Sequence, residues 1–401
     1  MSTVREADGT AASLRAAMVS ELHEMGVLQS EAVAKAVATV PRHLFATEES
    51  LESAYAANKA LVIKRDADGR ALSSLSATHI QAVMLEQAEI EPGMRVLEVG
   101  SGGYNAALLV ELVGDTGTVV TADIDAEIVE RARGCLDAAG YDRVQVVLAD
   151  AGSGVPEHAP FDRIMVTAAA WDIPPAWRDQ ISERGRIVVP LRMRGITRSV
   201  AFDRDGTGLV SASYRLCGFV PMQGNGAYAE RVLPLGEGAT LQLDDQRQTV
   251  DAEALAAAVH GPRLEVWSGA AFDLPDELEL FLVSSTPQMV MLHGSKHLVD
   301  QGVLGLSVTR GVPALVAGGS FAYRTKRPNE ETGGFESGVV AHGPEAQMVA
   351  ARYVELLRRW ASEHRRRGAA RIRYVPLAEG AAEPAVGVVA KRFGGVEITW
   401  S

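Results

Sequence analysis

The stretch Val96-Leu97-Glu98-Val99-Gly100-Ser101-Gly102-Gly103-Tyr104 decides the fold. An apolar run leads into a cluster of glycines, and a helical pattern follows, so this order predicts a strand, a glycine turn and a helix. The next apolar run, residues 119–122, ends at Asp123. Glycines let a ligand approach the backbone, and an acid after the second strand accepts hydrogen bonds from ribose hydroxyls. The pair predicts a nucleotide-like ligand; the alternative is a strand-to-helix turn that binds nothing.

Glu98 narrows the choice of ligand. A dinucleotide site favours G-x-G-x-x-G, with the pyrophosphate at the helix N-terminus, whereas here a carboxylate precedes the first glycine by two positions. A carboxylate at this point suits a ligand with a cationic amino-acid end. We therefore expect S-adenosyl-L-methionine as the methyl donor and S-adenosyl-L-homocysteine as its product.

Strand and helix patterns alternate from about residue 75 onward. Strands are expected at residues 95–99, 119–124, 144–148, 161–167 and 186–190, helices at 80–90, 105–113, 127–139 and 173–181, and a closing hairpin at 200–202 and 210–216. Alternation of this kind predicts a doubly wound, Rossmann-like parallel sheet that binds its ligand at the carboxyl ends of the strands. Gly100, Asp123, Asp150 and Thr167 all fall at such ends. The predicted fold class is α/β, a class I S-adenosylmethionine-dependent methyltransferase.

The length of 401 residues predicts more than one core. We expect an N-terminal helical and substrate-lid segment over residues 1–75, a donor-binding domain over 76–235 and an additional α+β domain over 236–401. Short apolar runs between Gly, Pro and Asp turns indicate the α+β domain. They lie at 264–266, 278–283, 289–292, 314–316 and 321–324, followed by a long helix after Gly343-Pro344 and a terminal hairpin, 386–390 and 396–400, turning at Gly394-Gly395. Residues 327–334 are expected to form a polar loop.

Composition excludes several classes of function. The formal net charge is -12, which disfavours nucleic acid as a partner. No run of 18 apolar residues or secretory signal is found, and the two cysteines make neither a disulfide framework nor a cysteine metal site. We expect a cytoplasmic enzyme without a metal or a membrane partner. Arg365-Arg366-Arg367 is either a solvated helix end or a contact for an acidic peptide.

Motifs outside the donor loop carry a resemblance to protein-L-isoaspartate O-methyltransferase over the first 230 residues. They occur in the order of that family: Val40-Pro41-Arg42-His43-Leu44-Phe45, Leu75-Ser76-Ala77-Thr78-His79, Asp162 with residues 164–169 and Ile173-Pro174, Asp179-Gln180, residues 185–190, and Gly218-Phe219-Val220-Pro221-Met222. Two departures are visible. The loop Gly102-Gly103-Tyr104 is one residue shorter than the family pattern, and Thr78 stands where the family has proline.

The tail resembles a subgroup, the FxLD-system methyltransferases that accompany lanthipeptides and other ribosomally made peptides. Phe321-Ala322-Tyr323 and the ending from Lys391-Arg392 to Trp400 carry this likeness. It implies methylation of an aspartate in a modified precursor peptide, giving an ester that closes to an aspartimide and hydrolyses to isoaspartate. Residues 236–401 would then recognise the precursor peptide. The alternatives are a general isoaspartate repair enzyme and a donor-binding protein without activity.

The resemblance also implies site residues. Ser76 would orient the substrate carboxylate, with Thr78 and His79 shaping the same loop. For Ser76 the alternative is a helix N-cap, and for His79 a satisfied, partly buried histidine. On the donor side, Glu98 and Gly100 would hold the methionine end, Asp123 the ribose, and Ile124 and Asp150 with Ala151 the adenine. The remaining donor-site candidates are Ser101, Gly102, Tyr104, Asn105 and Thr167.

Overall fold

The computed structural model describes residues 2–245, 248–377 and 388–400. These residues form two compact units. Unit 1 comprises residues 1–191 and 197–228, and unit 2 comprises residues 192–196 and 229–401. Residues 192–196, at the turn of one long hairpin, belong to unit 2, while the larger part of the two hairpin strands belongs to unit 1.

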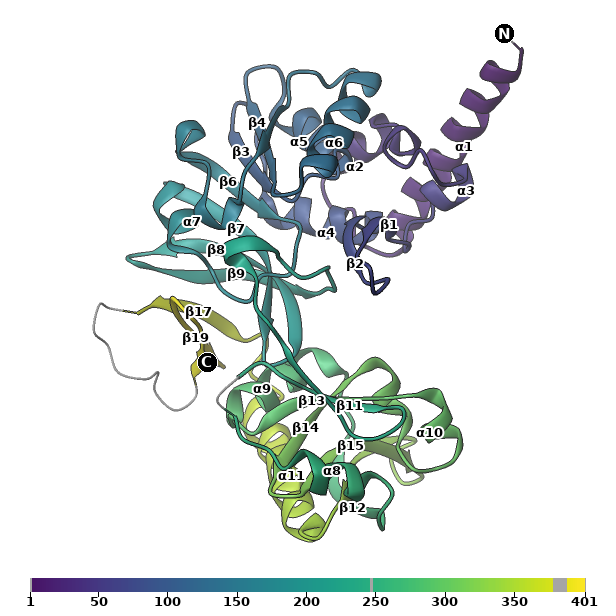
Figure 1. Ribbon diagram of the computed structural model, residues 1–401, viewed down its shortest axis with the longest axis vertical. Helices are drawn as coiled ribbons and strands as arrows, with labels where there is room; N and C mark the ends of the chain where they lie inside the picture. Colours follow the sequence, from purple (N-terminus) through teal and green to yellow (C-terminus); the bar gives the residue numbers. More distant parts are fainter. Residues whose placement is uncertain (1, 246–247, 378–387, 401) are drawn as a thin grey trace. The chain divides into compact units, whose positions relative to one another are not determined.

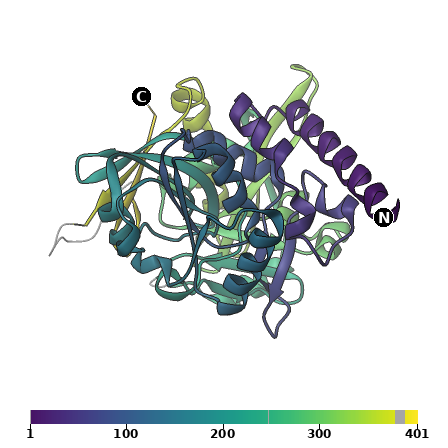
Figure 2. The same cartoon turned by 90° about the horizontal axis from the view of Figure 1, so that it is seen from above.

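Unit 1 begins with helices that pack beside its sheet. These are α1 (Ser2–Glu24), α2 (Glu31–Thr39) and α3 (Leu51–Ala54), and α1 is the long helix at the N-terminus in Figure 1 and Figure 2. Ser30 caps α2, because its side chain accepts a hydrogen bond from the Val33 backbone N–H at 3.2 Å. Helix α2 packs against α5 (Tyr104–Val113), which ties this segment to the donor-loop helix.

The sheet of unit 1 has the strand order β9-β8-β7-β6-β3-β4-β5. Its members are β3 (Arg95–Val99), β4 (Thr118–Asp123), β5 (Gln145–Leu148), β6 (Phe161–Val166), β7 (Ile181–Met193), β8 (Ile196–Asp205) and β9 (Gly208–Leu216). The pairs β3–β4, β3–β6, β4–β5 and β6–β7 are parallel, and β8–β9 is antiparallel. The predicted doubly wound sheet with a closing hairpin is confirmed. Its remaining helices are α4 (Thr78–Ala88), α6 (Ala126–Ala139) and α7 (Pro175–Gln180).

The chain order creates a switch point at β3. From β3 the chain proceeds outward to β4 and β5, and it then crosses to the other side of β3 to form β6 and β7. In doubly wound sheets a crevice opens at the carboxyl ends of the strands on either side of such a reversal. The strands around it are buried on both faces, with Val96, Leu97, Val120, Ile164 and Val166 inaccessible to solvent.

A two-stranded hairpin lies before the sheet, and the sequence analysis did not anticipate it. Its strands are β1 (Leu61–Arg65) and β2 (Ala71–Leu75), paired antiparallel. Lys64 on β1 makes ion pairs with Asp125 at 2.6 Å and with Glu127 at 2.7 Å, at the start of α6. The ion pairs hold the hairpin beside the loop that follows β4.

Unit 2 contains a seven-stranded sheet in the order β10-β11-β13-β14-β15-β16-β12. Its strands are β10 (Arg231–Pro234), β11 (Ala239–Leu243), β12 (Leu264–Ala271), β13 (Met289–Gly294), β14 (Val312–Ala317), β15 (Ser320–Asn329) and β16 (Gly334–His342), all paired antiparallel. Its helices are α8 (Ala252–Val259), α9 (Pro275–Ser285), α10 (Lys296–Asp300) and α11 (Ala346–Arg359). Helix α11 packs on β12, β15 and β16, and α8 packs on β15. Three further strands, β17 (Arg371–Pro376), β18 (Val388–Ala390) and β19 (Gly394–Thr399), pair antiparallel in the order β18-β19-β17.

The apolar run 278–283 lies in helix α9, which Pro275 opens at a position favoured by proline. Two local expectations for this region need correction. The expected polar loop at 327–334 is shorter, because β15 continues to Asn329, which pairs with Gly334. The terminal hairpin turns at residues 391–393, since Gly394 and Gly395 already belong to β19 and Gly395 pairs with Ala390. Residues 386 and 387 lie outside the described residues.

Two residues of the arginine cluster have partners within unit 2. Arg365 lies 2.8 Å from a carboxylate oxygen of Asp273, and Arg367 donates to the Trp400 carbonyl at 3.2 Å. Among the described residues, none of the helices has the length and apolar character that crossing a membrane requires.

Candidate functional site

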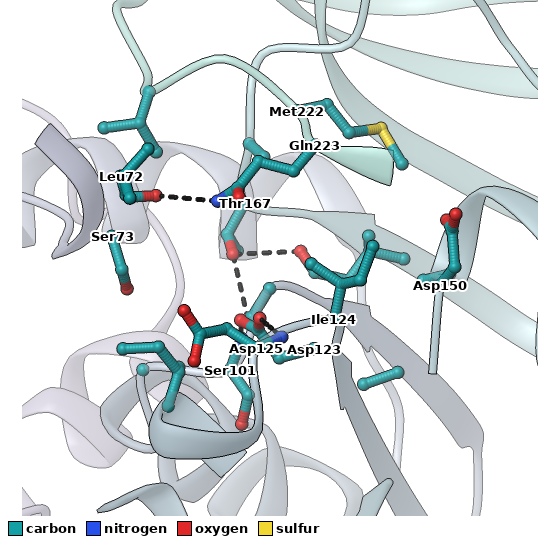
Figure 3. Close-up of a pocket in the computed structure, with 18 of the residues that line it drawn as sticks. Leu72, Ser73, Ser101, Asp123, Ile124, Asp125, Asp150, Thr167, Met222 and Gln223 are labelled. Atoms are coloured by element: carbon teal, nitrogen blue, oxygen red, sulfur yellow. Dashed lines mark hydrogen bonds between the residues drawn. The ribbon is translucent and has the colours of Figure 1, made fainter. Parts of the chain in front are cut away.

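The main pocket of unit 1 lies at the carboxyl ends of β3, β4, β5 and β6, at the switch point of the sheet. The pocket has a volume of about 680 Å³, which includes the solvent at its open mouth. The residues that follow these strands line it: Gly100 after β3, Asp123 at the end of β4, Asp150 after β5 and Thr167 after β6. Figure 3 shows the side chains of Asp123, Asp150 and Thr167 around the space. The sequence-predicted strand ends thus meet in one place.

The first wall is the glycine loop between β3 and α5. Gly100 has a φ of +98°, a conformation that favours glycine. A Cβ at this position would lie 2.5 Å from Thr167 Oγ1, so the position also needs the absence of a side chain. Thr167 Oγ1 is within hydrogen-bond distance of the carbonyls of Val99 (3.0 Å) and Gly100 (3.1 Å). The loop and the end of β6 therefore touch, and the pocket opens beside this contact.

Asp123 fixes the second wall. Its Oδ2 accepts the Ser101 N–H at 2.9 Å, and its Oδ1 accepts the Asp125 N–H at 2.9 Å (Figure 3). The carboxylate therefore orients the loops after both β3 and β4, while it still lines the pocket. Ile124 follows it with 40% of its surface exposed, which leaves an apolar face for a flat ring.

Asp150 and a later segment close the third side. Asp150 Oδ1 accepts the Gly152 N–H at 3.0 Å, and Oδ2 accepts the Asn225 N–H at 2.7 Å. Residues 220–223 reach the pocket here, since Met222 N–H donates to the Ala169 carbonyl at 3.0 Å. Ala151 also lines the pocket.

Glu98, Tyr104 and Asn105 do not form part of the pocket lining; they are buried behind the glycine loop. Glu98 Oε1 accepts from Asn105 Nδ2 at 2.8 Å, and its Oε2 accepts from Thr121 Oγ1 at 2.6 Å. Burial, with a contribution from the charge of Asp123, raises the pKa of Glu98 to about 7 against these two hydrogen bonds. Direct contact between Glu98 and the donor stays a prediction. In the observed geometry, Glu98 holds Asn105 and the neighbouring strand β4, through Thr121, in place.

The predicted substrate loop lies after β2, outside the pocket lining. Ser76 is half-buried, and its carbonyl accepts from Arg42 Nη2 at 2.8 Å. Helix α4 begins at Thr78 with Ala77 as its N-cap and no side-chain cap, so Ser76 does not cap it. Thr78 is buried, and its Oγ1 has no hydrogen-bond partner among the described residues. His79 Nδ1 lies 3.1 Å from the Ala57 carbonyl, the geometry of a satisfied, partly buried histidine. Their roles in catalysis stay predictions.

Sequence reasoning missed two parts of the pocket. One is the end of the β1–β2 hairpin, where Leu72, Ser73 and Ser74 line the space. The other is Met222 with Gln223, whose Nε2 donates to the Leu72 carbonyl at 3.4 Å. The motif ending in Met222 was recognised but not assigned to the site. Strands β1 and β2 have only five residues each, which is too short for the alternation of apolar and polar residues to indicate a hairpin.

The pocket fits S-adenosylmethionine by its own chemistry. Two carboxylates, Asp123 and Asp150, stand at the edge where ribose and adenine donors would bind, and Gly100 and Gly102 bring backbone without a side chain to the pocket wall. Ser101 Oγ and Asn105 Oδ1 are buried without a hydrogen-bond partner among the described residues, so polar groups remain to be satisfied around the loop. We find no group of three metal-binding side chains within the described ranges.

Comparison with known proteins gives the family. Residues 13–227, more than half of the chain, match the profile "Protein-L-isoaspartate(D-aspartate) O-methyltransferase". A protein-L-isoaspartate O-methyltransferase of Methanococcoides burtonii is 44% identical over 160 residues, 40% of this chain and 75% of that protein. Another, of Methanopyrus kandleri, is 36% identical over 219 residues, 54% of this chain and 94% of that protein.

A solved structure named protein-L-isoaspartate O-methyltransferase shares the fold. It is 23% identical with a TM-score of 0.52, and the match covers 96% of this chain and 99% of that one. The likeness in fold therefore extends past residue 227, into the region that the family profile does not cover. A C-terminal extension is thus found in that structure as well. With the donor pocket at the switch point and the family match over its whole surroundings, the chain belongs to the protein-L-isoaspartate(D-aspartate) O-methyltransferase family and is an S-adenosylmethionine-dependent carboxyl O-methyltransferase.

Proposed function

We propose that this enzyme methylates the free α-carboxylate of L-isoaspartyl residues in peptides and proteins. The observation that carries the proposal is the match of residues 13–227 to the family, which covers all residues that line the donor pocket. In an isoaspartyl residue the chain continues through the side-chain carbonyl, so the α-carboxylate is left free. Such a carboxylate is ionised near neutral pH and is already a nucleophile.

The reaction depends on the positioning of the substrate carboxylate more than on proton transfer. Bound S-adenosylmethionine supplies a methyl group on a cationic sulfur; a carboxylate oxygen forms the new bond to carbon as the carbon–sulfur bond breaks and sulfur keeps its electron pair. The chain's task is to hold that oxygen in line, about 3 Å from the carbon, an arrangement worth several kcal/mol. No proton moves in this step, so no general base is needed.

Each part of the site has an assigned task in this proposal. Asp123 binds the ribose hydroxyls, and Ile124 and Asp150 border the adenine. Thr167 stands where the loop after β6 meets the glycine loop, on the side from which the substrate would arrive. Ser76 donates a hydrogen bond to the substrate carboxylate, and Thr78 and His79 support its loop.

A narrower substrate is the second candidate: an aspartate in a modified, lanthipeptide-like precursor, methylated on its side chain and converted to an aspartimide. The observation that favours it is the resemblance of the tail to the FxLD-system enzymes. Phe321, Ala322 and Tyr323 are, however, fully buried in β15. These residues support the core of unit 2 and do not form a surface for a peptide.

One experiment separates these candidates. The enzyme is incubated with S-adenosylmethionine and, separately, with an isoaspartyl peptide, its aspartyl isomer and a ring-closed precursor peptide. Mass spectrometry then scores the methyl ester. The proposal expects rapid ester formation on the isoaspartyl peptide alone. Esterification of the ring-closed peptide alone would establish the narrower substrate, and no ester on any of them, despite calorimetric binding of S-adenosylhomocysteine, would contradict both.

A further inference from the structure

Arg42 is a fully buried cation beside the substrate loop. It begins the short helix η1 (Arg42–Phe45), and solvent reaches none of its surface. Within the described residues its guanidinium donates to three neutral acceptors: the Ala54 carbonyl at 2.9 Å, Gln81 Oε1 at 2.9 Å and the Ser76 carbonyl at 2.8 Å. The guanidinium also stacks over the Tyr104 ring, 4.7 Å from its centre. It thus joins the substrate loop to the first residue of the donor-loop helix.

The charge of Arg42 has no carboxylate partner within the part of the chain that the structure describes. The ionisable groups that act on it are the phenols of Tyr104 and Tyr55. Burial raises the pKa of Tyr104 to about 12, so this phenol stays neutral near physiological pH. Burial lowers the pKa of Arg42, but a guanidinium in a protein remains charged. A buried, uncompensated cation is costly, and arginine is normally paired when it is buried.

The position of the charge suggests what offsets this cost. Arg42 Nη2 bonds to the backbone of Ser76, the residue proposed to donate to the substrate carboxylate. An anion held by Ser76 would lie close to the guanidinium, in surroundings where charges are poorly screened by water. An uncharged carboxamide of the same shape would gain none of this attraction.

We propose that Arg42 is a positioning residue whose uncompensated charge makes the substrate site selective for an anionic carboxylate over its neutral carboxamide. The inference rests on the proposed function, because it assumes that an isoaspartyl carboxylate binds at Ser76. A merely structural role, in which Arg42 links η1, α3 and the loop before α4, would give no such selectivity for charge.

Gln81 offers a sharp test because it already accepts a hydrogen bond from Arg42. Gln81→Glu keeps the shape and the acceptor, and it supplies the missing counter-charge. Gln81→Met removes the acceptor without adding charge and is the matched control. In protein saturated with S-adenosylhomocysteine, so that no turnover occurs, calorimetry measures the dissociation constants of an isoaspartyl peptide and of its α-carboxamide. The ratio of the two constants reports discrimination of charge.

We expect wild type to prefer the carboxylate at least about tenfold, as one charge-assisted contact allows. Gln81→Glu should reduce the preference to about threefold or less, whereas Gln81→Met should retain it. Arg42→Met is the second variant and should lose the preference as well, with S-adenosylhomocysteine affinity unchanged. Circular dichroism confirms that each variant is folded.

Two results overturn the inference: equal affinity of wild type for both peptides, or a folded Gln81→Glu or Arg42→Met variant that keeps the wild-type preference. If wild type forms no ester on the isoaspartyl peptide, the proposed function itself fails. If the ester forms and the preference is insensitive to these variants, only the role of Arg42 fails.

Discussion

Each of the two units contains a hollow, and only that of unit 1 has the chemistry of a binding site. Counting the open solvent at their mouths, the pocket of unit 1 has a volume of about 680 Å³, and a hollow in unit 2 beside α8 and β14 has a volume of about 690 Å³. In unit 2 two polar side chains at the hollow make structural contacts: Asp251 caps α8 through the Ala254 N–H at 3.0 Å, and Gln288 accepts from Arg352 at 2.6 Å. In unit 1, Ser101 Oγ is buried and finds no hydrogen-bond partner in the described part of the chain, and carboxylates line the space. Volume alone therefore does not identify a site.

The largest effect is expected at the glycine that opens the unit 1 pocket. Gly100→Ala places a Cβ 2.5 Å from Thr167 Oγ1 at a φ of +98°. It should weaken S-adenosylhomocysteine binding at least about a thousandfold, about 4 kcal/mol, because the loop and β6 must separate. Isothermal calorimetry measures the affinity. Gly318→Ala is the control, since Gly318 lines the unit 2 hollow and also has a positive φ, +57°. Equal losses in both variants would show that backbone strain, and not the pocket, decides binding.

The units should respond to pH in opposite directions. Burial raises the pKa of Glu98 in unit 1 to about 7, so its contribution to stability is complete below 4.5 and is lost as pH rises through 7. In unit 2, His342 is stacked against Phe321, 4.9 Å between ring centres, and burial lowers its pKa to about 4. Its contribution is complete above 6.5 and is lost as pH falls through 4. Each shift corresponds to about 3 kcal/mol.

Scanning calorimetry of the donor-free enzyme from pH 4 to pH 8 measures both effects. Glu98→Gln should flatten the loss of unit 1 stability toward high pH, and His342→Phe should flatten the loss of unit 2 stability toward low pH. Because each variant removes one titrating group, the difference from wild type isolates that group. A pH dependence that neither variant changes would contradict the assignment.

A medium effect is expected at the ribose end of the pocket. Asp123→Ala removes the acceptor for the Ser101 and Asp125 N–H groups and the proposed contact to ribose, so donor affinity should fall by about 2 kcal/mol. Asp162→Ala is a matched control, because Asp162 accepts the Arg95 N–H at 2.9 Å where β6 begins, away from the pocket. It should lower the melting temperature and leave the affinity for S-adenosylhomocysteine unchanged. An equal loss of affinity in both variants would contradict a ribose contact.

The same contrast explains what the sequence could predict. In unit 1, Gly100 and the polar residues Asp123, Asp150 and Thr167 interrupt apolar runs at regular strand ends. Both the sheet and the part of the pocket at these strand ends were therefore predictable. The rest of the pocket lining was not predictable. Ser73 and Ser74 belong to a short hairpin whose pairing is set by contacts distant in sequence, and Gln223 reaches the pocket from beyond the last strand of the unit 1 sheet. In unit 2 the run 278–283 is apolar at every turn of a buried helix, and such a run cannot be distinguished from a strand by its period.

The smallest effect tests whether the β1–β2 hairpin contributes to donor binding. Lys64 holds the β1–β2 hairpin against Asp125 and Glu127, with 29% of its side chain exposed. Lys64→Met should weaken S-adenosylhomocysteine binding no more than about threefold, since exposed ion pairs contribute little, and wild-type affinity should approach the variant's as salt rises. Lys35→Met is the control, because Lys35 is exposed on α2. A threefold loss with a reduced salt dependence would make the hairpin part of the donor site. No change at any salt concentration would show that the ion pairs of the hairpin do not support donor binding, which would then depend on the residues at the strand ends.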